Sequence, residues 1–160
     1  MSGFFVLEEC GMHSGGCQCG KIRYHYSGDL LDPSICHCRM CQKAFGSWGA
    51  ALVIMMADQL TWTRGTPSTF RSSSIVERGF CKDCGTPLFM REDGDAHFEM
   101  AIGTLDDPDA IPPLSRQSAV ESRVSWFSTM HLLPEEKMTD YRTPEDLIKL
   151  KSLQHPDHDT

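Results

Sequence analysis

Seven cysteines gathered into three short segments are the residues of this sequence best suited to do chemistry. They are Cys36, Cys38 and Cys41 in a central group, Cys17 and Cys19 upstream, and Cys81 and Cys84 downstream. Thiols placed this closely in a chain usually hold metal. Zinc is the metal that suits them best, because it accepts soft thiolate ligands, has no redox chemistry of its own and takes four ligands tetrahedrally.

Seven ligands divide into a closed site of four and an open site of three. Gly20 follows Cys19 and Gly85 follows Cys84, and glycine permits the tight turn in which backbone N–H groups point at a thiolate, whereas Gln42 follows Cys41. We therefore assign the two flanking pairs to a structural zinc site that couples metal binding to folding. The central three cysteines are then the catalytic group, holding a zinc with an open fourth position.

The charge of the central site indicates its substrate. A zinc ion with three thiolates carries one negative charge, so it is a weaker Lewis acid than a zinc ion held by three histidines. A thiol is a better fourth ligand than water there, because zinc keeps it as a nucleophilic thiolate near neutral pH. Glutathione is such a thiol, and its carboxylates would need cations. The candidates are Arg39, Lys43, Arg71 and Arg78.

The sequence also allows two alternatives to an open metal site. In the first, His37, Cys10 or His13 supplies a fourth ligand and closes the site, although His37 lies between two ligands and would point away from them on an extended backbone. In the second, the three thiols form a redox group without metal.

Length and charge limit the class of protein. With 160 residues, 40% of them hydrophobic and 23% charged, the chain matches one globular domain. Its formal net charge of -7 argues against nucleic acid as a partner, because nucleic-acid affinity draws on Lys and Arg that neutralise phosphates. A small-molecule thiol or thiol adduct is the expected partner.

The N-terminal segment lacks the basic residues that open a secretory signal, and no apolar run approaches the length of a membrane span. We expect no membrane association and a reducing, cytoplasmic location, where clustered cysteines are metal ligands rather than disulfides.

Short stretches of alternating apolar residues separated by turns predict a mainly antiparallel β domain. We expect an N-terminal arm over residues 1–12, the β domain over 13–130 and a C-terminal extension over 131–160. Thr143 as N-cap before Pro144 predicts a short amphipathic helix over residues 143–153, and the polar tail after Gln154 is expected to be loose.

Three segments carry a resemblance to a known family. They are Gly15-Gly16-Cys17-Gln18-Cys19-Gly20, then Cys36-His37-Cys38-Arg39-Met40-Cys41-Gln42-Lys43, then Arg78-Gly79-Phe80-Cys81-Lys82-Asp83-Cys84-Gly85-Thr86-Pro87. In this order the chain resembles the glutathione-dependent formaldehyde-activating family, which also includes centromere protein V-like proteins. The match covers roughly residues 13 to 130 and departs from the family at Arg116-Gln117-Ser118, where a histidine is common.

The resemblance implies a single-domain zinc-binding β-tent, with the four-cysteine site structural and the three-cysteine site catalytic. It also implies carbon–sulfur lyase chemistry on a thiol adduct such as S-hydroxymethylglutathione. The alternative is a non-catalytic zinc-binding module that binds a protein partner, or a glutathione carrier. The last thirty residues lie outside the match, and we expect them either to cover the core or to mediate self-association into a homo-oligomer.

Overall fold

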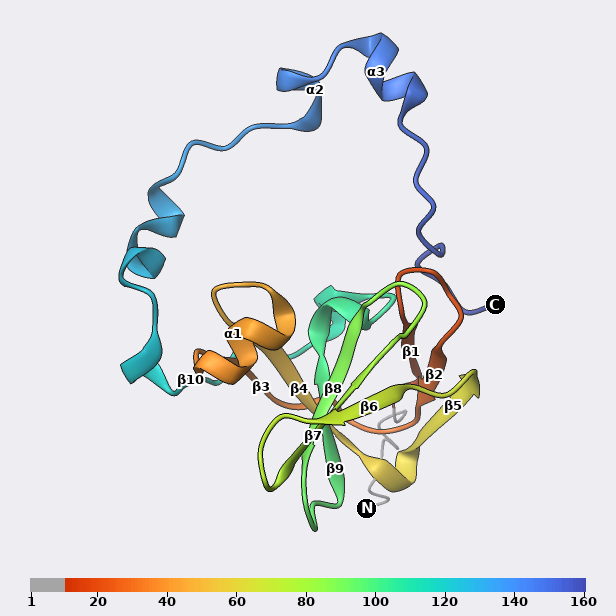
Figure 1. Cartoon of the computed structure of the whole chain (residues 1–160). Coiled ribbons are helices and arrows are strands. Elements are labelled where there is room, and N and C mark those ends of the chain that lie inside the picture. The colour runs from red at the N-terminus through yellow and green to blue at the C-terminus, as the bar shows by residue number, and fades with distance from the viewer. Residues whose placement is uncertain (1–10) are drawn as a thin grey trace, which may run out of the picture.

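Two β-sheets form the body of the protein in the computed structural model, which describes residues 11–160 (Figure 1). The smaller sheet has the order β1-β2-β5, with β1 at His13–Gly16, β2 at Arg23–Tyr26 and β5 at Leu60–Arg64. The larger sheet has the order β10-β3-β4-β9-β8-β7-β6. Its strands are β10 (Arg116–Ser118), β3 (Leu31–Cys36), β4 (Ala50–Met56), β9 (His97–Ala101), β8 (Pro87–Glu92), β7 (Val76–Phe80) and β6 (Ser68–Arg71).

The strands pair antiparallel throughout except at one edge, where β10 runs parallel to β3. The mainly β prediction is therefore confirmed. Three elements are not what their residue types suggest. The strand β1 ends in Gly15 and Gly16, and β3 contains Asp32 and Pro33, although these residue types favour turns. The strand β10 ends at Ser118, shortly before a 3-10 helix over Val120–Ser122.

Helices are short. The helix α1 spans Arg39–Phe45 and ends at Gly46, whose left-handed conformation (φ 58°) directs its N–H back to the last turn. Near the C-terminus lie α2 (Met138–Tyr141) and α3 (Pro144–Lys149). The 3-10 helices are Ala57–Gln59, Ile102–Thr104, Pro108–Ala110, Val120–Ser122 and Ser125–Leu132.

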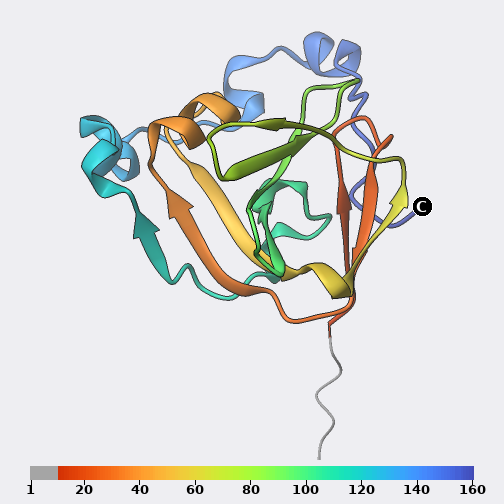
Figure 2. The same ribbon diagram turned by 60° about the horizontal axis from the view of Figure 1, so that its bottom comes forward.

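The hydrophobic core lies between the two sheets. Tyr24 and Tyr26 of β2 are fully buried against Val53 and Met55 of β4 and Met100 of β9. Figure 2 shows the smaller sheet standing against one end of the larger one. Burying aromatic and aliphatic side chains contributes roughly 1.5–3 kcal/mol each, so this core fixes the sheets that carry the cysteines.

Strand ends deliver the cysteines to two places. The turn between β1 and β2 carries Cys17 and Cys19, and β7 ends at Phe80, directly before Cys81. On the other side, β3 ends at Cys36, and α1 begins after Cys38. Cys10 lies outside the described residues.

The C-terminal extension leaves the larger sheet after β10, arcs away from the body and returns beside β1 and β2 (Figure 1). The helix α3 covers only part of the predicted range 143–153, because Leu150 adopts extended backbone angles and Leu153 is 93% exposed. Leu132, Leu133 and Ile148 are also exposed, so residues 132–153 add nothing to the core.

The expectation of a loose tail is wrong. The N–H of His155 donates to the carbonyl of Gln18 at 2.7 Å, Arg64 donates to the carbonyl of Thr160 at 2.9 Å, and Asp159 pairs with His25 at 2.8 Å. These contacts hold the tail against the smaller sheet. In the part of the chain that the structure describes, no helix has the length and apolar character needed to cross a bilayer.

Candidate metal centre

The first cysteine group joins two turns that are distant in sequence. The sulfur atoms of Cys17, Cys19, Cys81 and Cys84 all lie within 4.8 Å of one another, with 3.5 Å between Cys17 and Cys19 and 3.9 Å between Cys19 and Cys81. Zinc at about 2.3 Å from each of four tetrahedral sulfurs would place those sulfurs about 3.8 Å apart. The cluster therefore has the dimensions of a four-thiolate zinc site.

The local backbone explains this grouping. Gly20 and Gly85 have φ of 74° and 77°, a left-handed conformation that is inexpensive only for glycine. Their N–H groups donate to the carbonyls of Cys17 and Cys81, at 3.0 and 2.8 Å, and close each turn. Gly20 and Gly85 thus each close a turn next to a cysteine pair, as the sequence predicted.

Hydrogen bonds and burial set the thiol pKa values in the absence of metal. The Ile22 N–H donates to the Cys17 sulfur at 3.3 Å, but burial dominates and raises the pKa of Cys17. Burial also acts to raise the pKa of Cys84, yet hydrogen bonds from Thr86 and Cys19 together outweigh it and lower that pKa to about 6. One thiolate is thus readily available for a first metal bond.

The second group comprises Cys36, Cys38 and Cys41, whose sulfur atoms also lie within 4.8 Å of one another. Cys38 is the N-cap of α1, and its sulfur accepts from the Cys41 N–H at 3.3 Å. Cys36 and Cys38 are partly exposed while Cys41 is fully buried. A ligand from solvent can therefore approach the cluster from the side of Cys36 and Cys38.

A hydrogen bond between Cys36 and Cys41 shifts the pKa values of the two thiols in opposite directions. It is the largest cause that lowers the pKa of Cys36, to about 5, with help from the backbone of Cys38 and the hydroxyl of Ser118. The same bond, together with burial, raises the pKa of Cys41. Without metal, Cys36 on the accessible side of the group is therefore the more acidic thiol, and the buried Cys41 is the less acidic one.

Arg78 reaches the second group from β7. Its side chain is 3% exposed, Nη2 donates to the Cys41 sulfur at 3.4 Å, and Nε donates to the Ser72 hydroxyl at 2.9 Å. The sequence placed Arg78 among the carboxylate-binding cations. The structure places its guanidinium against a cysteine of the cluster, and the role in binding a carboxylate stays a prediction.

The other predicted cations lie on the surface. Arg39 and Lys43 are exposed on α1 beside the cluster, and Lys43 makes no ion pair with any residue that the structure describes. Arg39 donates to the Gln42 side chain. Arg71 already pairs with Asp93 through both terminal nitrogens at 2.7 Å, which leaves Arg39 and Lys43 as the available cations.

The histidines named as alternative ligands face elsewhere. His37 is fully buried, and its Nε2 lies 2.9 Å from the Gln117 side-chain oxygen, with Phe127 packed against its ring at a centroid distance of 4.8 Å. His13 stacks on Tyr26. Among residues 11–160, neither joins the cysteine groups.

Several supporting residues escaped the sequence analysis. Gln42 donates to the carbonyls of His37 and Ser122 at 2.6 and 2.9 Å, and the Gln117 side-chain oxygen lies 2.9 Å from Nε2 of His37. Glu99 on β9 has its pKa raised by burial and by the nearby Cys36. The sequence does not reveal that Glu99 lies buried near Cys36, because a polar residue in an alternating strand is expected to face solvent.

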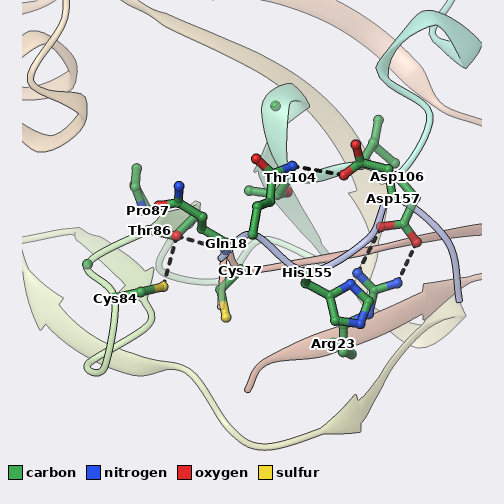
Figure 3. Close-up of a pocket in the computed structure, with 15 residues that line it drawn as sticks. Cys17, Gln18, Arg23, Cys84, Thr86, Pro87, Thr104, Asp106, His155 and Asp157 are labelled. Atoms are coloured by element: carbon green, nitrogen blue, oxygen red, sulfur yellow. Dashed lines mark hydrogen bonds and ion pairs between the residues drawn. The ribbon is translucent and has the colours of Figure 1, made fainter. Parts of the chain in front are cut away.

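A cavity of about 440 Å³, which the sequence did not predict, lies beside the four-cysteine group. Figure 3 shows the residues that line it. Arg23 and Asp106 form a buried ion pair there, with 2.8 Å between Nη1 and Oδ1, and Arg23 also donates to the carbonyl of His158 in the tail. His155 and Asp157 line the same cavity. The tail thus closes one side of a polar space that the body alone would leave open.

Comparison with known proteins identifies a family whose match includes both cysteine groups. The family model described as glutathione-dependent formaldehyde-activating enzyme matches residues 12–120. The chain belongs to this family. The matched region contains all seven clustered cysteines and ends before the C-terminal arc.

Curated relatives are distant. A Schizosaccharomyces pombe protein named an uncharacterized lyase is 32% identical over 79 residues, which cover 48% of this chain and 56% of that protein. A Penicillium rubens protein provisionally named a glutathione-dependent formaldehyde-activating enzyme is 28% identical over 96 residues, which cover 53% of this chain and 50% of that protein. The chain thus spans about half the length of the curated relatives it matches.

A solved structure supports the fold. The crystal structure of a Rhodobacter sphaeroides protein superposes with a TM-score of 0.52 at 18% identity, covering 66% of this chain and 99% of that chain. At this identity the likeness concerns the fold alone.

Proposed function

We propose that this protein is a zinc-dependent carbon–sulfur lyase-like enzyme that acts on a thiol adduct such as S-hydroxymethylglutathione. The four-cysteine group holds a structural zinc, and Cys36, Cys38 and Cys41 hold a catalytic one. The observation that carries the proposal is the ligand count. The second group gathers three sulfurs, and among the described residues no fourth Cys, His, Asp or Glu joins it.

Family membership and the lyase name of the Schizosaccharomyces pombe relative support this choice of chemistry. The exposure of Cys36 and Cys38 supports it as well, because a ligand can reach the open side of the group. Exposure alone does not distinguish the two groups, since Cys19 of the four-cysteine group is also exposed, but a zinc ion already held by four thiolates has no position left for a further ligand.

Arg78 offsets the charge of the site. A zinc ion with three thiolates carries one negative charge, which would oppose the addition of a fourth thiolate. The guanidinium against Cys41 supplies one positive charge in a buried position, where charges interact more strongly than in water. Arg39 and Lys43, exposed on the adjacent helix, are the cations proposed to receive the carboxylates of glutathione.

When bound, zinc supplies a positive centre that keeps the substrate sulfur as thiolate. In the joining direction, the sulfur lone pair forms a bond to the carbonyl carbon of the aldehyde, and the π pair moves to the oxygen, which takes a proton. In the cleaving direction the hydroxyl loses that proton, the C=O bond reforms and the C–S pair returns to sulfur. The chain's own contribution is to position the thiol and to compensate charge.

The test measures formaldehyde released from S-hydroxymethylglutathione against the uncatalysed rate, since the adduct also forms and breaks unaided. The zinc-loaded protein is expected to accelerate release, and Cys38→Ser is expected to abolish the acceleration while the chain stays folded. Glutathione binding without any acceleration would favour the carrier alternative. Absence of both would leave a non-catalytic zinc module and refute the proposal.

A further inference from the structure

An aromatic cavity is connected to the three-cysteine group through Arg78, which lines the cavity and donates to the Cys41 sulfur. Its volume is about 220 Å³, and it lies between α1 and strands β6 to β8. Its lining comprises Ala44, Phe45, Phe70, Arg78, Gly79, Phe80, Gly85, Pro87 and Phe89. Four of these residues are phenylalanines and only Arg78 is charged, so the cavity suits an apolar group with a single polar atom near Arg78.

Arg78 connects this cavity to the cysteines. Two of its nitrogens are engaged by Cys41 and Ser72, whereas Nη1 is buried and has no partner among the residues that the structure describes. A buried donor without an acceptor is destabilising, and the side chain is only 3% exposed. A ligand oxygen placed in the cavity could accept from Nη1.

A second hollow adjoins the first. It measures about 530 Å³ and shares Ala44 and Phe70 with the aromatic cavity, while Arg39 and Lys43 lie on its rim. One molecule could therefore place carboxylates near the surface cations and an apolar group among the aromatic rings. The arrangement matches a peptide thiol that carries a substituent on sulfur.

The size of the inner cavity argues against formaldehyde as the only partner of the thiol. A water molecule occupies about 30 Å³ of liquid, so the space equals about seven waters. The single carbon of formaldehyde would leave most of it unfilled, and an aromatic lining offers that carbon little. A longer aliphatic or aromatic chain would remove both its own surface and the cavity's from water.

We propose that this cavity is a subsite for the aldehyde-derived group, so that the protein acts on adducts between glutathione-like thiols and apolar or aromatic aldehydes. Arg78 donates from Nη1 to the oxygen on the sulfur-bearing carbon, and the phenylalanine rings pack against the remaining chain. The reaction is the same reversible addition of a thiol across C=O, so no further reactant is needed. The inference rests on the proposed function and names its substrate class.

Stable thioethers test it by calorimetry on the zinc-loaded full chain. Each methylene buried strengthens binding by about fourfold, so S-hexylglutathione is expected to bind at least tenfold more tightly than S-methylglutathione. Ala44→Leu, which places extra bulk in the cavity from α1, is expected to bring the ratio of the two affinities near one. Ala110→Leu adds the same bulk at an exposed position of a 3-10 helix and should leave the ratio unchanged.

Phe70→Ala provides a second variant, because that ring is 46% exposed and its removal leaves the core intact. It should lower the affinity ratio at least threefold. A ratio near one in the unaltered protein overturns the subsite, as does a high ratio that neither variant lowers. If glutathione itself binds the zinc-loaded protein while the thioethers bind equally, the subsite fails and the proposed function stands; if glutathione does not bind, the proposed function fails.

Discussion

The two cysteine groups should differ in how much they stabilise the fold, and paired double variants measure the difference. Cys19→Ser with Cys84→Ser disables the four-cysteine group, while Cys36→Ser with Cys38→Ser disables the three-cysteine group. None of these four residues is fully buried, so neither pair of substitutions places a hydroxyl in the core. The comparison therefore isolates the metal cross-link.

The magnitude follows from the length of chain that each site closes. The first group joins Cys19 to Cys81, which are 62 residues apart. By the relation used for cross-linked loops, closing such a loop contributes about 4 kcal/mol, whereas the short loop from Cys36 to Cys41 contributes about 2 kcal/mol. Domains are stable by only about 5–15 kcal/mol, so the first loss leaves the protein marginal and the second leaves it folded.

Urea denaturation of the zinc-loaded proteins, followed by tryptophan fluorescence and circular dichroism, gives both free energies of unfolding. The Cys19/Cys84 variant should lose about 2 kcal/mol more than the Cys36/Cys38 variant. Equal losses, or a larger loss in the Cys36/Cys38 variant, would refute the division into a structural and a catalytic site.

Three further outcomes follow from polar contacts. Asp106→Asn breaks the buried pair with Arg23 and should cost about 3–5 kcal/mol of unfolding free energy. Burial opposes ionisation of Asp106, but hydrogen bonds from Arg23 and Ser14 prevail and lower its pKa. The ionised carboxylate therefore stabilises the fold above the ordinary pKa near 3.8, and this stabilisation is lost as pH falls below that value. Acid titration of both proteins would show the difference. Removal of residues 154–160 should speed hydrogen exchange at the N–H groups of the smaller sheet, and unchanged exchange would contradict a docked tail. Gln42→Ala leaves the carbonyls of His37 and Ser122 without their donor and should lower the free energy of unfolding, measured thermally, by about 1–3 kcal/mol. Lys43→Ala removes an exposed side chain from the same helix and should not have this effect.

The sequence predicted which cysteines gather in which group, because the short spacings and the glycines after Cys19 and Cys84 are local signals. The left-handed φ of Gly20 and Gly85 realises the turns that those glycines indicated. Apolar alternation likewise predicted the mainly β class.

The parts of the fold and of the site that the sequence did not predict depend on contacts between distant segments. The strand β3 contains Asp32 and Pro33 and reads as a turn, yet β4 on one side and β10 on the other pair with it. The tail has no apolar pattern, so its docking through main-chain hydrogen bonds left no trace in the sequence. Arg78 could be named as a cation, but its burial against Cys41 follows only from the position of β7.

The central claim is that one cysteine group is closed and the other keeps an open position for a thiol. The most direct measurement counts metal per chain and then titrates glutathione into protein in which cobalt replaces zinc, following the thiolate charge-transfer absorption. The account predicts two metal ions per chain, one for each group, and a saturable spectral change on adding glutathione that is lost in Cys38→Ser. A single tightly bound ion and a spectrum that glutathione leaves unchanged would contradict it.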